Sequence, residues 1–150
     1  MSDPYWKIVE PVWDSISIYD GENVFLEQFE KATEKQKNLF SSHWAQSEIL
    51  NGGLAQFFSN PTGVLAPEAV EAFRKLGMPK CAQAIEDAMS FFGDEYPRNR
   101  ELREECLERF YEENKEIEIP LEKYEDLVAD NIEEENGGFL DSANKYATQG

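Results

Sequence analysis

Five glutamates between residues 101 and 112 recur at a spacing that places them on one side of a helix. At about 100° per residue, their side chains fall within one arc of roughly 100°. They are Glu101, Glu104, Glu105, Glu108 and Glu112, and the opposite side carries Leu102, Cys106, Leu107, Phe110 and Tyr111. With a rise of ~1.5 Å per residue, the row carries about one negative charge per 3 to 4 Å, close to the ~3.4 Å between phosphates along one DNA strand. The pattern predicts a helix that is anchored by its apolar side and presents a row of carboxylates.

Acidic residues continue beyond this helix and dominate the charge of the chain. The second acidic group comprises Glu116, Glu118, Glu122, Asp126, Asp130, Glu133 and Glu134. The chain has 31 Asp and Glu against 14 Lys and Arg, a net charge of -17, and residues 94–150 alone hold 18 acidic and 7 basic residues. Such a surface repels nucleic acids and anionic membranes, and it attracts basic partners.

An ordinary solvated helix surface is the alternative explanation for the glutamate row, because glutamate is a good surface helix former. Like charges at i and i+4 each cost a few tenths of a kcal/mol, so stability alone does not favour the row. Arg98, Arg103 and Arg109 offset part of that cost.

No set of residues matches a catalytic or metal-binding motif. His43 is the single histidine, which excludes two-histidine metal sites and the HExxH motif. Cys81 and Cys106 stand apart from each other in helical patterns, and we expect them to be reduced thiols in the core. The segment DNIEEE resembles a calcium loop, but Ile132 occupies a ligand position and the sixth residue is not glycine. We therefore expect no catalytic residue, no metal and no cofactor.

The elements that must position these residues are helices. Thr33 and Gln36 fit a capping box, and apolar residues follow at helical spacing up to the glycines at 52 and 53. Proline starts and glycine ends predict further helices from Pro67 to Gly77, Pro79 to Gly93, Pro97 to about Lys115, and Pro120 to Gly137, with a short last one. Strand evidence is thin, since the alternating runs at 15–19 and 116–119 have no hairpin turn beside them. The sequence predicts an all-α fold, a compact single domain over residues 1–150 with about seven to nine helices.

The stretch EILNGGLAQFFSN predicts a sharp corner between two helices. Asn51 and Gly52 are typical of a helix C-terminus, and a second glycine lets two backbones approach closely. Phe57 and Phe58 would then fill the core from the next short helix. Glu48 and Gln56, if buried, would hydrogen-bond the exposed amides and carbonyls of the corner. A small-ligand pocket at the corner is the alternative.

Several segments resemble a small bacterial family, the DNA-mimic proteins of the DMP type, first catalogued as a domain of unknown function. The resemblance covers nearly all of residues 5–149, including PVWDSISIYDG near the start and GGFLDSANKYA near the end. Its most specific part, which we call the family signature, comprises Trp44, Glu48, Asn51, Gly52, Gly53, Gln56, Phe57, Phe58, Ser59, Asn60 and Gly63. The resemblance implies a compact all-helical fold, a homodimer, and surface carboxylates that stand in for phosphates when the protein binds a transcription factor.

These observations together predict a non-enzymatic DNA mimic that blocks a basic DNA-binding protein, without binding nucleic acid or membranes itself. The N-terminal residues lack a signal peptide and the thiols suit a reducing compartment, so we expect a cytoplasmic protein. Two alternatives remain open: an enzyme or ligand-binding protein centred on Glu48, Asn51 and Gln56, and an acidic helical scaffold with an unrelated partner.

Overall fold

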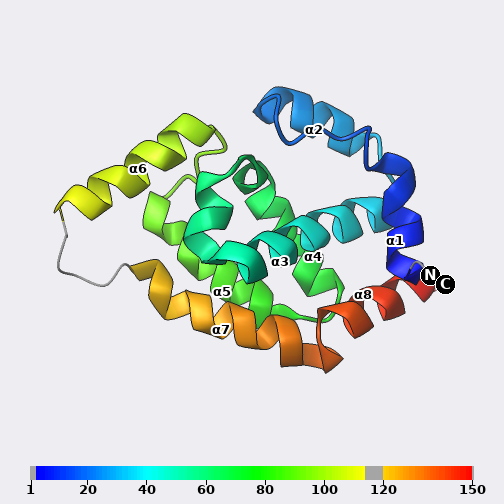
Figure 1. The fold of residues 1–150 in the computed structure, drawn as a ribbon. Helices are drawn as coiled ribbons and strands as arrows, with labels where there is room; N and C mark the ends of the chain where they lie inside the picture. The colour runs from blue at the N-terminus through cyan, green and yellow to red at the C-terminus, as the bar shows by residue number, and fades with distance from the viewer. Residues whose placement is uncertain (1–2, 114–119, 150) are drawn as a thin grey trace.

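The computed structural model describes residues 3–113 and 120–149, which form α-helices joined by short 3₁₀-helices and loops (Figure 1). The α-helices are α1 (Pro4–Val9), α2 (Glu22–Glu30), α3 (Glu34–Ser59), α4 (Ala66–Lys75), α5 (Pro79–Met89), α6 (Arg100–Glu113), α7 (Pro120–Glu134) and α8 (Phe139–Thr148). The 3₁₀-helices are η1 (Glu10–Val12), η2 (Pro61–Leu65), η3 (Ser90–Phe92) and η4 (Glu135–Gly137). No strand occurs in the described part of the chain, so the predicted all-α fold is confirmed.

Helix α3 runs through the middle of the molecule, and α1, α4, α6, α7 and α8 pack against it (Figure 1). It begins with the predicted capping box. The Thr33 hydroxyl accepts the N–H of Gln36 at 3.2 Å, and the Gln36 side chain accepts the N–H of Thr33 at 2.9 Å. The helix is interrupted at Gly53, whose φ of 84° and ψ of 178° are not helical. Residues 54–59 therefore form a separate short segment, which lies against α6.

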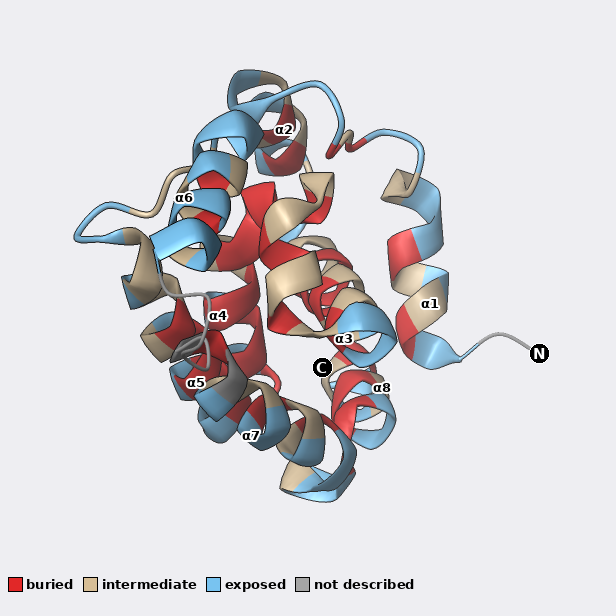
Figure 2. Cartoon of the chain, turned by 60° about the vertical axis from the view of Figure 1, so that its left-hand side comes forward, coloured by how far each residue is buried: buried red, intermediate tan, exposed pale blue. Residues whose placement is uncertain are grey.

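Large aromatic side chains fill the core around α3. Phe40, Phe57, Phe58 and Phe73 are 1% exposed or less. Figure 2 shows the buried residues turned toward this interior, while the outer sides of α6 and α7 are exposed. A membrane span would need a longer apolar helix than any in the described residues.

The pair α4 and α5 forms a helical hairpin as the proline and glycine signals predicted. Pro67 and Pro79 both lie in the first turn of their helices, where proline leaves no helical hydrogen bond unmade. Gly77 ends the first of them with a φ of 79°, a left-handed conformation that favours glycine. Each of the two helices buries a side that is rich in alanine.

Helix α6 starts at Arg100, three residues later than the predicted start near Pro97. The side-chain oxygen of Asn99 accepts the N–H of Leu102 at 3.1 Å, so Asn99 caps the helix and fixes its first turn. The predicted end near Lys115 lies outside the described residues, as does the alternating run at 116–119. The other alternating run forms no strand; it buries Ile16 and Ile18 from a loop of turns and bends.

The first and last described segments lie side by side, at the end of the molecule opposite α6 (Figure 1). The backbone N–H of Tyr5 donates to Asn144 Oδ1 at 3.1 Å, which ties α1 to α8. Lys35 at the start of α3 donates from Nζ to the carbonyl of Ala147 at 3.1 Å. A lysine suits this position because the last carbonyls of a helix are unpaired and carry partial negative charge.

Candidate partner-binding surface

Helix α6 presents a row of carboxylates to solvent. Glu101, Glu105, Glu108 and Glu112 are all exposed, whereas Glu104 is half-buried. Glu104 also forms an ion pair with Arg100, one turn earlier, with 3.2 Å between Oε1 and Nε. Within the described residues, the four exposed glutamates of this row form no ion pair, so their carboxylates face solvent. We call these four residues the α6 row.

The buried side of α6 differs from the prediction. Leu102 and Tyr111 are 54% and 45% exposed, so the expectation that they anchor the helix is wrong. Leu107, which belongs to the predicted apolar side, is buried as expected, and Arg103 is buried beside it. At about 100° per residue, the packed direction lies midway between Arg103 and Leu107, and Leu102 lies roughly 120° to one side of it. The apolar side of a helical wheel therefore predicts only approximately which side of the helix is buried.

Helix α7 carries a second acidic surface. Asp126, Asp130, Glu133 and Glu134 are exposed, while Leu121, Val128 and Ile132 are buried on the opposite side of the helix. Helices α6 and α7 lie apart in both views, with other helices between them, so their described acidic residues form two separate surfaces (Figures 1 and 2). Of the predicted site, Glu116, Glu118 and the side chain of Glu122 lie outside the described residues.

A hollow of about 380 Å³ lies between α6 and the segment 54–59. Ala55 and Leu107 contribute apolar surface to it, and Glu104 and Glu108 bring carboxylates to the same place. The acidic surface of α6 is therefore continuous with a partly apolar depression, which Gln56 and Ser59 of the family signature also line.

The corner of α3 confirms the predicted turn but places it one residue later. Gly53 alone, among Asn51, Gly52 and Gly53, has a positive φ. The first N–H of the next segment, that of Leu54, donates to the Glu125 carboxylate of α7 at 2.9 Å. A Cβ on Gly53 would lie 2.0 Å from that carboxylate oxygen, so glycine is needed both for its φ and for the close approach of α7.

Glu48 and Gln56 are only half-buried, so the condition for their predicted bonds to the corner backbone is not met, and they bond each other instead. The Glu48 carboxylate accepts hydrogen bonds from Gln56 Nε2 at 3.2 Å and from Asn60 Nδ2 at 3.0 Å. These bonds join the two segments of α3 through their side chains. The backbone is served by Glu125, which lies far away in the sequence.

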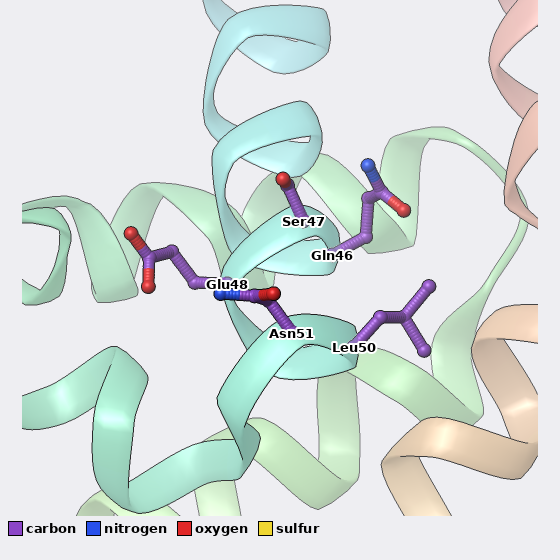
Figure 3. Close-up of a pocket in the computed structure, with 5 residues that line it drawn as sticks. All are labelled: Gln46, Ser47, Glu48, Leu50 and Asn51. Atoms are coloured by element: carbon purple, nitrogen blue, oxygen red, sulfur yellow. The ribbon is translucent and has the colours of Figure 1, made fainter.

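The corner does not gather its polar residues into one pocket. A hollow of about 450 Å³ is lined by Gln46, Ser47, Glu48, Leu50 and Asn51, all from one stretch of α3. Figure 3 shows Glu48 and Leu50 pointing to opposite sides of that helix. Gln56, the third polar residue of the ligand-pocket alternative, is not among the lining residues. In residues 3–113 and 120–149, no three Cys, His, Asp or Glu side chains are grouped so that they could hold a metal ion.

The aromatic residues of the signature have two different positions. Phe57 and Phe58 are fully buried, as predicted. Trp44 is half-buried at the surface of α3 and stacks on Trp13, with ring centroids 5.0 Å apart and planes 13° apart. Nδ1 of the neighbouring His43 and the Tyr5 hydroxyl form a hydrogen bond 3.1 Å long. Burial lowers the pKa of the His43 imidazole.

Arg103 is the main residue whose role the sequence did not reveal. We expected it only to offset repulsion within the glutamate row, but its side chain is completely buried. Its Nε donates to the carbonyl of Phe58 at 2.7 Å, and its Nη2 donates to the carbonyl of Asn60 at 3.0 Å. Burial lowers the pKa of the guanidinium, which stays charged at neutral pH because an arginine pKa starts so high.

Comparison with known proteins relates the chain to one family. The family model described as DMP19-like protein matches residues 30–149, which contain the corner, α6 and α7. The chain belongs to the DMP19-like protein family. No curated protein and no solved structure matches it. The DMP19-like match begins at the last residue of α2, so it covers α3 to α8 and leaves α1 outside.

Proposed function

We propose that this DMP19-like protein is a non-enzymatic mimic of DNA. It binds the DNA-contacting surface of a transcription factor or another basic DNA-binding protein, and so prevents that protein from binding DNA. The observation that carries the proposal is the α6 row, in which Glu101, Glu105, Glu108 and Glu112 are exposed without an ion pair among the described residues.

The spacing of the α6 row supports contact with phosphate-binding residues. Its members are three or four residues apart, which corresponds to steps of about 4.5 to 6 Å along the helix. Half or more of the hydrogen bonds in protein–DNA complexes go to phosphate and sugar, and lysine and arginine supply many of them. The same basic side chains can donate to carboxylates in charge-assisted hydrogen bonds. The exposed acids of α7 add a second line of charge.

The packing of α6 supports preorganised binding. Its inner side is held by the buried Arg103 and Leu107, so the glutamates project from a backbone that is already ordered. A preordered surface loses less conformational entropy on association than a mobile acidic tail does. Long-range attraction from a chain of net charge -17 would accelerate association, and binding would weaken as salt rises.

The test is capture of a partner followed by competition with DNA. Immobilised protein is incubated with a cell lysate at low salt, and bound proteins are eluted either with duplex DNA or with salt. A basic protein released by DNA is identified and purified, and its DNA binding is then titrated with the free mimic. We expect inhibition that is competitive with DNA. A partner that binds without competing with DNA would support the scaffold alternative and contradict the proposal.

A matched pair of variants shows whether position matters beyond total charge. The first replaces the α6 row (Glu101→Gln, Glu105→Gln, Glu108→Gln, Glu112→Gln). The second removes the same charge from exposed acids of η1, the loop after it and α2 (Glu10→Gln, Asp14→Asn, Glu27→Gln, Glu30→Gln). We expect the first variant to inhibit at least tenfold more weakly and the second to lose less than threefold. Equal losses would mean that net charge, not the α6 row, governs binding.

A further inference from the structure

We infer that Arg103 is the positioning residue for the partner-binding helix, and that the end of the family signature forms part of the socket that receives it. The inference rests on the proposed function, since it assigns to the signature the task of orienting the α6 row. The socket consists of the carbonyls of Phe58, Asn60, Pro97 and Arg98 together with the space above Gly63.

The guanidinium of Arg103 joins three segments of the chain. Its bonds to the carbonyls of Phe58 and Asn60 satisfy the C-terminal end of α3, where helical carbonyls are otherwise unpaired. Its Nη1 donates to the carbonyls of Pro97, at 3.3 Å, and Arg98, in the segment that leads into α6. No carboxylate of the described residues pairs with it, so its charge is met by carbonyl oxygens and by the negative end of the α3 dipole.

Gly63 makes room for this side chain. A Cβ at residue 63 would lie 2.7 Å from Nε and 2.9 Å from Cζ of Arg103, which is too close for either group to remain in place. Gly63 is not among the residues with positive φ, so glycine is needed here because it leaves space for the guanidinium, not because of the backbone conformation. Its carbonyl accepts the Tyr96 hydroxyl at 2.6 Å, which holds this backbone beside the guanidinium. The last glycine of the signature thus has a specific physical reason.

The direction of Arg103 determines where the glutamates point. On the helix wheel, Arg103 lies about 140 to 180° from each member of the α6 row, so the row projects away from the socket. Leu107, one turn further, is buried on the same side as Arg103 and adds apolar contact. Fixing the guanidinium therefore fixes the rotation of α6 about its own axis, and with it the direction of the carboxylates.

Two substitutions separate this positioning role from electrostatics. Arg103→Gln makes the protein more acidic, so attraction to a basic partner alone predicts binding that is equal or tighter. Loss of the socket predicts the opposite, a partner affinity at least tenfold weaker. The matched control is Arg109→Gln, which removes the same charge from the exposed side of the same helix and should bind at least as tightly as wild type. Arg103→Lys keeps the charge without the planar fork and should resemble Arg103→Gln.

Gly63→Ala tests the socket without changing any charge and covers the case in which the Arg103 variants fail to fold. We expect it to weaken partner binding and to raise amide hydrogen exchange in residues 100–113 while α4 and α5 keep their protection. Folded variants that bind like wild type and keep α6 protected would overturn the inference. The exchange measurement needs no partner, so a wild type that captures no DNA-displaceable protein would contradict the proposed function while the socket is still judged by exchange.

Discussion

The carboxylate of Glu125 on α7 accepts the backbone N–H of Leu54 at 2.9 Å, at the point where α3 is interrupted. The first N–H groups of a helical segment have no partner within the segment, and they usually bind a side chain just before it. Here the partner comes from a different helix. The corner and α7 are therefore coupled, so that a change in one should be felt in the other.

The first prediction concerns this bond. Glu125→Ala leaves the N–H of the buried Leu54 without its partner, and we expect a loss of about 1–3 kcal/mol in the free energy of unfolding. Urea denaturation followed by circular dichroism measures the change. Asp126→Asn is the matched control on the exposed side of α7 and should stay within about 0.5 kcal/mol of wild type. If both variants lose the same stability, the bond has no special importance.

The second prediction separates the two glycines of the corner. Gly53→Ala forces a side chain into a conformation essentially reserved for glycine, which costs about 1–3 kcal/mol, and it also meets the Glu125 carboxylate. Gly52→Ala meets only the end of the Gln56 side chain and should cost less. The same denaturation experiment compares them. In a Glu125→Ala background the cost of Gly53→Ala should shrink, because one of its two causes is gone; strict additivity would contradict this coupling.

The third prediction is that repulsion within the α6 row costs stability. Glu108 has Glu104 and Glu112 four residues away on either side, and like charges at this spacing destabilise a helix by about 0.2–0.5 kcal/mol each. Glu108→Gln should raise the melting temperature at low salt, and about 0.5 M NaCl should remove the difference by screening. Glu27→Gln, which removes the carboxylate 3.9 Å from Lys31, should give no such gain. A gain that persists in salt would point to packing instead.

The fourth prediction concerns His43. Burial lowers its pKa below the ordinary 6.5, so between these two values the folded protein binds fewer protons than the unfolded chain. Its contribution to stability is complete above about pH 6.5 and is lost as pH falls toward the lower, folded-state pKa. Comparing wild type with His43→Gln cancels the many carboxylates common to both. The stability difference should narrow from roughly pH 7.5 to 5.5, and a constant difference would refute a buried neutral imidazole.

Local signals were enough to predict most of the helices. The Thr33 capping box, the prolines that open α4, α5 and α7, and the glycines at 77 and 138 all act within one turn of the residues they affect. Local sequence did not reveal that Asn99, rather than Pro97, starts α6, because a short side chain must be seen to bind an N–H before it can be recognised as a cap.

The positions that local sequence did not reveal are determined by tertiary contacts. Glu125 and Asp126 are neighbours in an acidic run, yet one points into the corner of α3 and the other into solvent. Arg103 looks like a surface base because buried arginines are rare, and two of its carbonyl partners, Phe58 and Asn60, lie far from α6 in the sequence. The partner, the dimer and the cytoplasmic location stay predictions.

The close approach of the two ends of the described chain has a practical consequence. The hydrogen bond between Tyr5 and Asn144 holds these ends together on the side of the molecule away from α6 (Figure 1). A fluorophore, affinity tag or biosensor linker attached at either end would therefore leave the glutamates of α6 pointing into the medium. The same molecule can be mounted on a surface by one end and carry a reporter at the other without obstructing an approaching protein.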